Sequence, residues 1–175
     1  MDTSLSKEKL SGKEYIKSCI RKDYSIQIQD GDFSYGPEGK PYIEKFAHSF
    51  NLSHSDDIMC LIICGYRAEV GIDIQVVRRN YHTEDIARRA FLPDEIEWME
   101  KREDGFFQMW TMKEALIKAH GGSIWDSARY GSAAEKEGSY DRYLLSFKGK
   151  RYYLAIYPGQ RNLILPDGWN LIELR

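Results

Sequence analysis

The 175-residue sequence lacks any hydrophobic run as long as the 18 or so residues that a membrane-spanning helix needs. Its polar beginning, MDTSLSKEKLSGKEY, lacks the apolar stretch that forms the core of a signal peptide. It also lacks an excess of basic residues: the formal net charge of −2 argues against a dedicated nucleic-acid binder, which is usually basic overall. These absences predict a cytoplasmic protein that binds neither nucleic acid nor membrane.

Cysteine is scarce, and its spacing fits no metal-binding motif. The three cysteines are Cys19, Cys60 and Cys64, and the last two lie in the apolar segment MCLIICGY, where we expect small core residues. An odd number of cysteines without a disulfide pattern indicates a reducing compartment. Internal repeats and low-complexity linkers are absent as well. With 42% hydrophobic and 30% charged residues, the chain is expected to fold around a core.

Apolar periodicity predicts a mixture of helices and strands. Helical spacing is found at about residues 7–22, in HTEDIARRAF with Thr83 as the cap, in PDEIEWMEKRED with Pro93 in the first turn, and at residues 106–120. Strands are expected at 49–55, 58–64 and 68–76, in a hairpin turning at 148–150, and in the closing WNLIEL. Residues 31–42 and 121–142 are expected to form loops. Without strict βαβ alternation, this order favours an α+β fold.

The helix predicted at residues 106–120, FFQMWTMKEALIKAH, carries charges that a core helix would avoid. At 100° per residue, Lys113 projects from the middle of an apolar arc, and Glu114 and Lys118 stand one turn apart on the neighbouring face. For a helix taken alone, a snorkelling lysine and an ordinary surface ion pair are the commoner explanation of such residues. The helix alone therefore leaves a structural and a functional interpretation open.

The strand predicted at residues 68–76, AEVGIDIQV, supplies a second carboxylate. Alternation turns Ile72 and Ile74 towards a core, so Asp73 and Gln75 share the opposite face. Two carboxylates from a strand and a helix suit a hard cation such as magnesium, which also binds the oxygens of substrate phosphates. A nearby lysine can neutralise phosphate charge. This combination indicates phosphoryl transfer, although an aspartate and a glutamate alone are a weak signal.

Four segments in a fixed order make the signal specific: GKPYI, SFNLSHSDD, VGIDIQ and WTMKEALIK. Together they resemble the 4′-phosphopantetheinyl transferases of the large surfactin-synthetase-activating (Sfp) type. The signature of that family is a G-I/V-D strand followed, about forty residues on, by W/F-x-x-K-E-A/S-x-x-K, here Trp110 to Lys118. The resemblance extends from about residue 9 to the end of the polar loop that follows this helix.

The resemblance implies an enzyme that transfers the 4′-phosphopantetheine arm of coenzyme A to a serine of an apo acyl or peptidyl carrier protein. Adenosine 3′,5′-bisphosphate would be released. It also implies two pseudo-symmetric α+β halves, at residues 1–70 and 71–175, with the active site in the cleft between them. The expected partners are coenzyme A and an acidic apo carrier protein, and a monomer can complete such a site. The carrier of fatty-acid, polyketide or nonribosomal peptide biosynthesis stays open.

The resemblance also implies roles for individual residues. Asp73 and Glu114 match the magnesium ligands, and either Glu114 or a metal-bound water is expected to help deprotonate the carrier serine. Lys118 matches the lysine that contacts the phosphates and protonates the leaving group. The coenzyme A-binding set comprises Lys40, Ser53, His54, Lys113 and Lys118. Many relatives carry an acid where this chain has Gln75, so Gln75 is expected to be a weak ligand or to act through water.

Several alternatives and departures accompany this interpretation. Fewer residues precede Gly12 than is usual in the family, so the N-terminal half is expected to be shortened. A shortened relative could bind coenzyme A or a carrier without transferring anything. A magnesium-dependent nuclease or phosphatase would need a denser acidic cluster than this sequence contains. The basic cluster at Arg78, Arg79, Arg88 and Arg89 is either a solvated face or a docking site for the acidic carrier.

Overall fold

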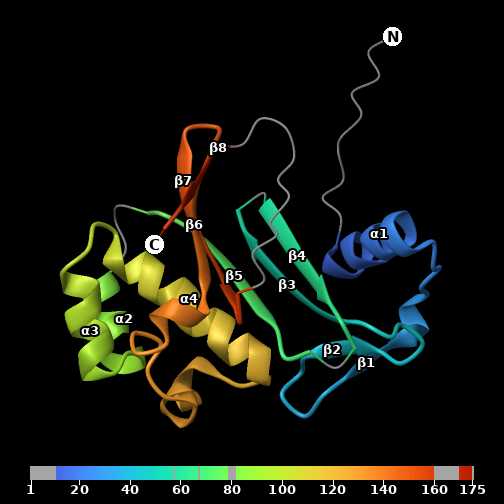
Figure 1. The fold of residues 1–175 in the computed structure, drawn as a ribbon, viewed down its shortest axis with the longest axis horizontal. Coiled ribbons are helices and arrows are strands. Elements are labelled where there is room, and N and C mark those ends of the chain that lie inside the picture. The colour runs from blue at the N-terminus through green and yellow to red at the C-terminus, as the bar shows by residue number, and fades with distance from the viewer. Residues whose placement is uncertain (1–10, 57, 67, 79–81, 160–169, 175) are drawn as a thin grey trace.

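The computed structural model describes residues 11–56, 58–66, 68–78, 82–159 and 170–174 (Figure 1). Its α-helices are α1 (Gly12–Tyr24), α2 (Thr83–Ala90), α3 (Pro93–Glu100) and α4 (Gly105–His120). Its strands are β1 (Phe33–Tyr35), β2 (Pro41–Ile43), β3 (Ser49–Ser55), β4 (Ile58–Cys64), β5 (Gly71–Val76), β6 (Asp141–Phe147), β7 (Lys150–Tyr157) and β8 (Asn170–Glu173). Short 3₁₀ helices occur at η1 (Asp30–Asp32), η2 (Ile124–Tyr130) and η3 (Glu137–Ser139). The content is α+β, as predicted.

The strands form three antiparallel sheets. β1 pairs with β2, β3 pairs with β4, and the third sheet has the order β5-β7-β6-β8. In Figure 1, α4 lies along the four-stranded sheet with α2 and α3 beyond it, and α1 lies at the other end beside β3 and β4. Within the described residues, no helix combines the length and the apolar character that crossing a membrane requires.

Helix α1 begins later than predicted. A capping box closes its first turn: Ser11 Oγ accepts from Glu14 N, and Glu14 Oε2 accepts from Ser11 N at 2.8 Å. The start expected near residue 7 falls outside the described residues. Ile16 and Ile20 face inwards and pack in a cluster with Phe33 and other residues of the β1–β4 region.

The segment predicted as a loop at residues 31–42 contains the hairpin of β1 and β2. Gly36 N donates to Lys40 O at 2.9 Å across its turn, and Gly39 adopts a φ of +80° that favours glycine. Phe33 and Ile43 are buried opposite each other in this hairpin. The glycines and prolines of this segment predicted a loop. A strand of three residues also shows too little alternation to be recognised in the sequence.

Of the two predictions about the starts of α2 and α3, the first is wrong and the second is confirmed. Thr83 is the first helical residue of α2, and His82 occupies the cap position without a side-chain cap bond, so Thr83 is not the cap. Pro93 opens α3 as predicted, where its missing N–H costs nothing. The Glu95 side chain reaches back to accept from Leu92 N at 2.7 Å and completes that first turn.

Helix α4 lies directly on β5 because residue 71 has no side chain. A Cβ atom at Gly71 would lie 1.9 Å from Ala115 O and 2.6 Å from Ala119 N. The predicted alternation of β5 is confirmed, since Val70, Ile72 and Ile74 are buried in the core on the face away from α4. The face predicted to carry Asp73 is therefore the face that α4 covers.

The C-terminal strands follow the predictions. β6 and β7 form the expected hairpin, and both turn residues have positive φ, +48° at Lys148 and +74° at Gly149. Strand β8 is the expected closing strand and pairs with β6. The predicted surface loop at 121–142 contains η2 and η3, and its residues Ser132 and Ala133 are buried.

Side chains of β3 accept hydrogen bonds from the backbone N–H groups of β5. Asn51 Oδ1 accepts from Ile72 N at 2.9 Å, Ser53 Oγ from Ile74 N at 3.3 Å, and Ser55 Oγ from Val76 N at 3.0 Å. Each pair is separated by 21 residues, so the two strands run in the same direction. We call this row the β3–β5 seam. It places the polar face of β3 beside Asp73.

Candidate active site

Asp73 lies at the point where β3, β5 and α4 meet. Its Oδ1 accepts from Ser53 Oγ at 2.8 Å and from Lys118 Nζ at 2.6 Å, and only 5% of the residue is exposed. Its Oδ2 is buried and has no hydrogen-bond partner among the described residues. A buried carboxylate oxygen without a partner is costly, so this atom is suited to an additional cation or donor.

Glu114 and Lys118 reach the same place from α4. Both are partly buried, one turn apart, as the helical spacing predicted. Lys118 Nζ also donates to Ser53 Oγ at 3.1 Å, so the ammonium bridges β3 and β5. Burial raises the pKa of Glu114, and the negative charge of Asp73 acts in the same direction. The structure thus brings together a strand aspartate, a helix glutamate and a helix lysine.

The two carboxyl groups have raised pKa values for related reasons. Burial raises the pKa of Asp73, although Lys118 and Ser53 act in the opposite direction. Burial also raises the pKa of Glu114, the negative charge of Asp73 raises it further, and Lys118 lowers it. Two carboxylates in a partly desolvated position repel each other, and a divalent cation would relieve that repulsion.

These residues fit a magnesium ion in number and chemistry. The partnerless Asp73 Oδ2 and the Glu114 carboxylate are hard oxygen donors, and magnesium commonly binds through one or two protein carboxylates and completes its shell with water and substrate oxygens. No group of three or more His, Cys, Asp or Glu residues suited to a metal occurs in the part of the chain that the structure describes. The site would therefore depend on oxygens from outside the chain.

Gln75 lies two residues beyond Asp73 on the same strand and is partly buried. Its Nε2 donates to Val76 O at 3.3 Å, a weak local bond. An amide held this loosely is free to turn its oxygen elsewhere. Its role as a weak ligand stays a prediction.

Lys113 lies away from this group. Its ammonium pairs with Glu95, and the two side chains are 1% and 0% exposed. Glu95 also accepts from Ala133 N at 2.9 Å, so the pair ties α3, α4 and the following loop together. Lys113 therefore has no exposed ammonium to offer a phosphate, because Glu95 neutralises it inside the core. The sequence could not show this, since nothing marked Glu95 as its partner.

Ser53 and His54 point in opposite directions from β3. Ser53 is buried in the β3–β5 seam, whereas His54 is exposed and lies opposite Met59 of β4 in the strand register. The strand predicted at residues 49–55 is confirmed as β3. Both lie within β3, and only His54 is accessible from solvent.

Lys40 joins the β1–β2 turn to the end of α4. Its Nζ donates to Val70 O at 3.0 Å and to Ala119 O at 2.9 Å, and burial lowers its pKa. A cation at the C-terminal end of a helix is favourable, because the carbonyl groups there carry partial negative charge. Two of the three N–H groups of Lys40 are thus used within the chain.

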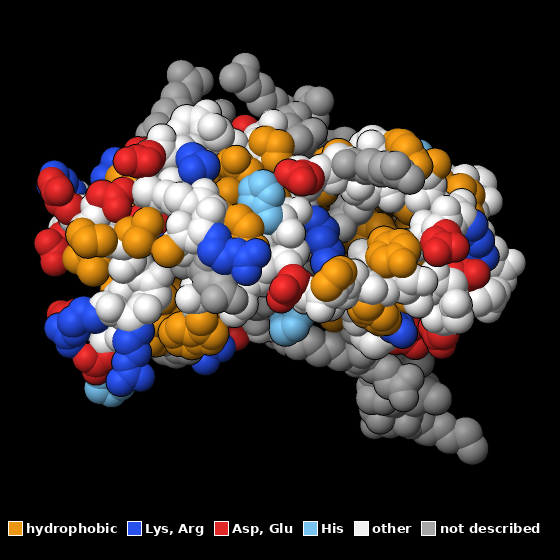
Figure 2. Space-filling view, turned by 90° about the horizontal axis from the view of Figure 1, so that it is seen from below, with side chains coloured by type: hydrophobic (Ala, Val, Ile, Leu, Met, Phe, Trp, Pro, Cys, Tyr) orange, Lys and Arg blue, Asp and Glu red, His pale blue; other side chains and the backbone are white. Residues whose placement is uncertain are grey.

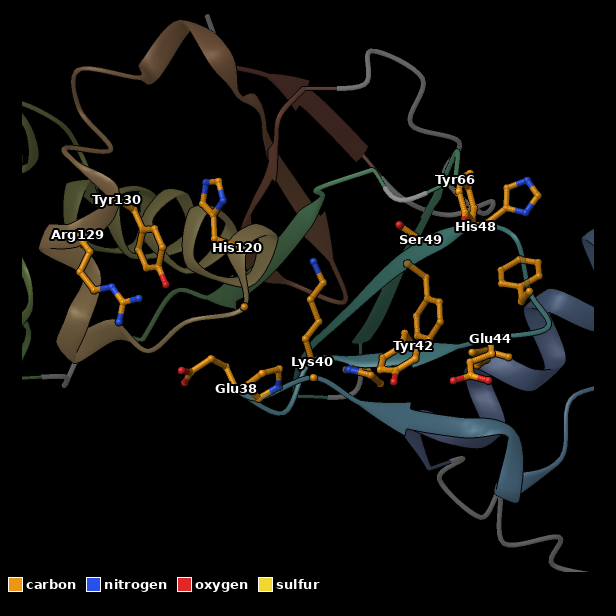
Figure 3. Close-up of a pocket in the computed structure, with 17 residues that line it drawn as sticks. Glu38, Lys40, Tyr42, Glu44, His48, Ser49, Tyr66, His120, Arg129 and Tyr130 are labelled. Atoms are coloured by element: carbon orange, nitrogen blue, oxygen red, sulfur yellow. The ribbon is translucent and has the colours of Figure 1, made fainter.

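A pocket of about 850 Å³ opens beside Lys40. Figure 3 shows Lys40 between His120 and Tyr130 on one side and Tyr42 on the other. His120 and Tyr130 stack with 5.1 Å between their ring centroids. Asp73, Glu114 and Lys118 are not among the lining residues, so the pocket and the carboxylate site are neighbouring features at the α4–β5 contact and not one cavity.

The predicted basic cluster is divided by ion pairs. Arg78 pairs with Asp56 at 2.7 Å and Arg88 with Asp85 at 2.5 Å, and Arg79 lies outside the described residues. Figure 2 shows acidic and basic side chains interspersed over the end of the molecule formed by α2 and α3. Such a surface is not strongly basic, so its use in docking an acidic protein stays a prediction.

Comparison with known proteins gives consistent matches. A family described as the 4′-phosphopantetheinyl transferase superfamily matches residues 69–159, slightly more than half of the chain. This range contains Asp73, Gln75, Glu114 and Lys118.

Individual relatives agree with this match. The chain is 34% identical over 123 residues to the 4′-phosphopantetheinyl transferase HetI of Nostoc sp., covering 65% of this chain and 52% of that protein. It is 33% identical over 119 residues to a 4′-phosphopantetheinyl transferase of Bacillus subtilis, covering 64% and 51% respectively. It is 36% identical over 97 residues to AcpT of Escherichia coli, covering 52% and 49%. The chain spans about half the length of these curated relatives.

Proposed function

The chain belongs to the 4′-phosphopantetheinyl transferase superfamily, and we propose that it transfers the 4′-phosphopantetheine arm of coenzyme A to a serine of an apo carrier protein. The observation that carries this proposal is the meeting of Asp73, Glu114 and Lys118 at the contact of β5 with α4. The order of the four sequence segments supports the Sfp type within the superfamily. The reaction would release adenosine 3′,5′-bisphosphate.

Asp73 and Glu114 would hold magnesium, with Gln75 contributing weakly or through water. When bound, the ion would supply positive charge to the pyrophosphate of coenzyme A. Two carboxylates and one ammonium carry a formal charge of −1 together, which by itself repels a phosphate. The protein residues therefore need the cation before they can accept the substrate.

The remaining chemistry is assigned to side chains of α4. The carrier serine oxygen attacks the phosphorus next to the pantetheine arm, and the bond from that phosphorus to the oxygen of the adenosine bisphosphate breaks. Glu114 accepts the serine proton as the general base. Lys118 stabilises the negative charge on the leaving phosphate and can protonate it. Positioning and charge neutralisation dominate such transfers.

The coenzyme A contacts that we propose are Lys40, His54 and Lys118. The pocket beside Lys40 has room for part of a nucleotide, and His54 is exposed at the far end of β3. Lys113 is left out of this set because it is buried against Glu95. Division into halves at 1–70 and 71–175 belongs to the proposal, and the start of the four-stranded sheet at Gly71 supports that boundary. We also propose that the protein acts as a monomer in the cytoplasm.

The direct test is mass spectrometry of intact carrier proteins. Apo carriers from fatty-acid, polyketide and peptide synthesis would be incubated with the full chain, coenzyme A and magnesium. We expect one carrier class to gain the mass of phosphopantetheine, with adenosine 3′,5′-bisphosphate as co-product. A carrier whose acceptor serine is replaced by alanine, and the Glu114→Gln enzyme, are the controls. Coenzyme A binding by calorimetry without transfer to any carrier would instead identify a relative that only binds.

A further inference from the structure

We propose that Ser53 positions Asp73 for cation binding and does not bind a substrate phosphate. This inference rests on the proposed function and assigns Ser53 a role different from the one that the family resemblance implies. Ser53 lies in the middle of the β3–β5 seam, only 5% exposed, and touches both Asp73 and Lys118. The argument depends on which of its partners can donate a hydrogen bond.

The hydrogen of the Ser53 hydroxyl has only one acceptor in this arrangement. A serine hydroxyl carries one hydrogen and two lone pairs. Ile74 N and Lys118 Nζ can only donate, so they occupy the two lone pairs at 3.3 Å and 3.1 Å. The hydrogen therefore points at Asp73 Oδ1, at 2.8 Å. All three valences of the hydroxyl are used, and nothing remains to bind a phosphate oxygen.

The consequence for Asp73 is a fixed carboxylate plane. Ser53 and Lys118 both donate to Oδ1, which leaves Oδ2 buried and without a partner among the described residues. A carboxylate held by one oxygen presents the other in a defined direction. Mutation of a residue that orients a metal ligand in this way typically lowers metal affinity about ten- to a hundredfold.

The seam itself provides the matched control. Ser55 Oγ accepts from Val76 N at 3.0 Å in the same way that Ser53 accepts from Ile74 N, and both serines are buried. Ser55 shows no bond to Asp73 or Lys118 in the described part of the chain. Ser55→Ala and Ser53→Ala therefore remove the same type of seam bond, but only Ser53→Ala releases Asp73.

The test measures Mn²⁺ binding to the full chain by electron paramagnetic resonance of the free ion, without coenzyme A. We expect Ser53→Ala to weaken Mn²⁺ binding about tenfold or more, and Ser55→Ala to change it less than about twofold. Ser53→Thr keeps a hydroxyl and Ser53→Val has the same shape without one, so only the threonine should retain affinity. In transfer assays at Mg²⁺ concentrations that saturate the variant, Ser53→Ala should leave KM for coenzyme A nearly unchanged, whereas at limiting Mg²⁺ it should lower turnover.

Several outcomes overturn the inference. Unchanged Mn²⁺ affinity in Ser53→Ala with a raised KM for coenzyme A would make Ser53 a phosphate contact. Equal losses in Ser53→Ala and Ser55→Ala would make the seam, and not Ser53, responsible. If Ser53→Ala does not fold, the threonine and valine variants decide the question. A wild-type chain that transfers nothing would defeat the proposed function. Normal transfer by the wild type, together with unchanged Mn²⁺ affinity in the Ser53 variants, would defeat only this inference.

Discussion

Lys118 Nζ donates to Asp73 Oδ1 over 2.6 Å and thereby links α4 to β5 across 45 residues of sequence. The Asp73 side chain is almost fully buried, whereas 28% of the Lys118 side chain is exposed. The ammonium is thus the only cation on this carboxylate within the described residues, and it remains accessible from solvent. This pair is the basis for the first prediction.

Lys118→Ala should reduce kcat/KM for carrier modification on the order of 10²-fold or more, because a developing phosphate charge loses its neutralising group. Lys118→Arg keeps the charge but not the compact ammonium, so it should restore activity only in part. The alanine variant also leaves Asp73 buried without its counter-ion, which should cost up to about 3 kcal/mol of stability. Activity assays and thermal melts measure the two effects.

Added magnesium should distinguish the effect of Lys118→Ala on activity from its effect on stability. If Asp73 binds the ion, added Mg²⁺ should raise the melting temperature of Lys118→Ala more than that of the wild type. Lys101→Ala, which removes an exposed ion pair with Glu97, is the control and should change neither the transfer activity nor the melting temperature. Near-wild-type turnover in Lys118→Ala would reduce this lysine to a structural role.

Gln75→Glu should be tolerated and should tighten metal binding severalfold. The glutamate adds a charged oxygen on the strand face that carries Asp73, and only the weak bond from Gln75 Nε2 to Val76 O is lost. Mn²⁺ titration of the purified variant, together with the transfer assay, tests both points. Loss of activity in a folded variant would show a role for the amide that we have not identified.

At Mg²⁺ concentrations below saturation, transfer should decline on the acid side at a pH above 4.5, the ordinary pKa of a glutamate, because burial and Asp73 raise the pKa of Glu114 and its protonation competes with the metal. The same shift affects stability. A folded-state pKa above the unfolded value contributes stability that is present below pH 4.5 and lost as the pH rises through the raised pKa. Metal-free protein should therefore gain stability from this group on mild acidification.

Urea denaturation in chelator across this pH range tests the effect on stability. Glu114→Gln should flatten the dependence, and a saturating divalent cation should do the same in the wild type. A carboxyl ¹³C titration that places the pKa of Glu114 at or below its ordinary value would contradict both statements.

Gly71→Ala should separate the two halves of the proposed metal site. Its Cβ would overlap Ala115 O at 1.9 Å, so α4 must move away from β5. We expect a loss of about 1–3 kcal/mol or more in the free energy of unfolding, together with weaker Mn²⁺ binding. Gly31→Ala is the matched control, because no atom lies within 4 Å of its Cβ position. Unchanged Mn²⁺ affinity in Gly71→Ala would show that this contact does not set the site geometry.

Lys113→Met should destabilise the protein by about 3–5 kcal/mol, since it leaves the Glu95 carboxylate buried without a counter-ion. Combining it with Glu95→Gln should recover only part of that loss, because the amide oxygen can still accept from Ala133 N but the amide nitrogen cannot accept from Leu92 N. Chemical denaturation measures both. KM for coenzyme A should stay unchanged in the double variant, and a marked rise would restore Lys113 as a phosphate contact.

The sequence by itself determined the directions of the functional side chains. Alternation along residues 70–75 set Asp73 and Gln75 opposite the buried isoleucines, and helical spacing set Glu114 and Lys118 on one face. These relationships follow from the periods of 2.0 and 3.6 residues, which any strand or helix imposes on its side chains. The order of four short segments then indicated the 4′-phosphopantetheinyl transferase superfamily, which the family match supports.

Only the tertiary structure decided which side chains become partners. The pairing of Lys113 with Glu95, the seam bonds of Ser53 and the use of Lys40 at the end of α4 all join segments that are distant in sequence. Periodicity states which way a side chain points and not what it meets there. Partners depend on how closely two elements approach, as at Gly71, where the missing side chain admits α4. Packing between distant segments thus buries one lysine of α4, Lys113, in the core and brings another, Lys118, to the candidate active site.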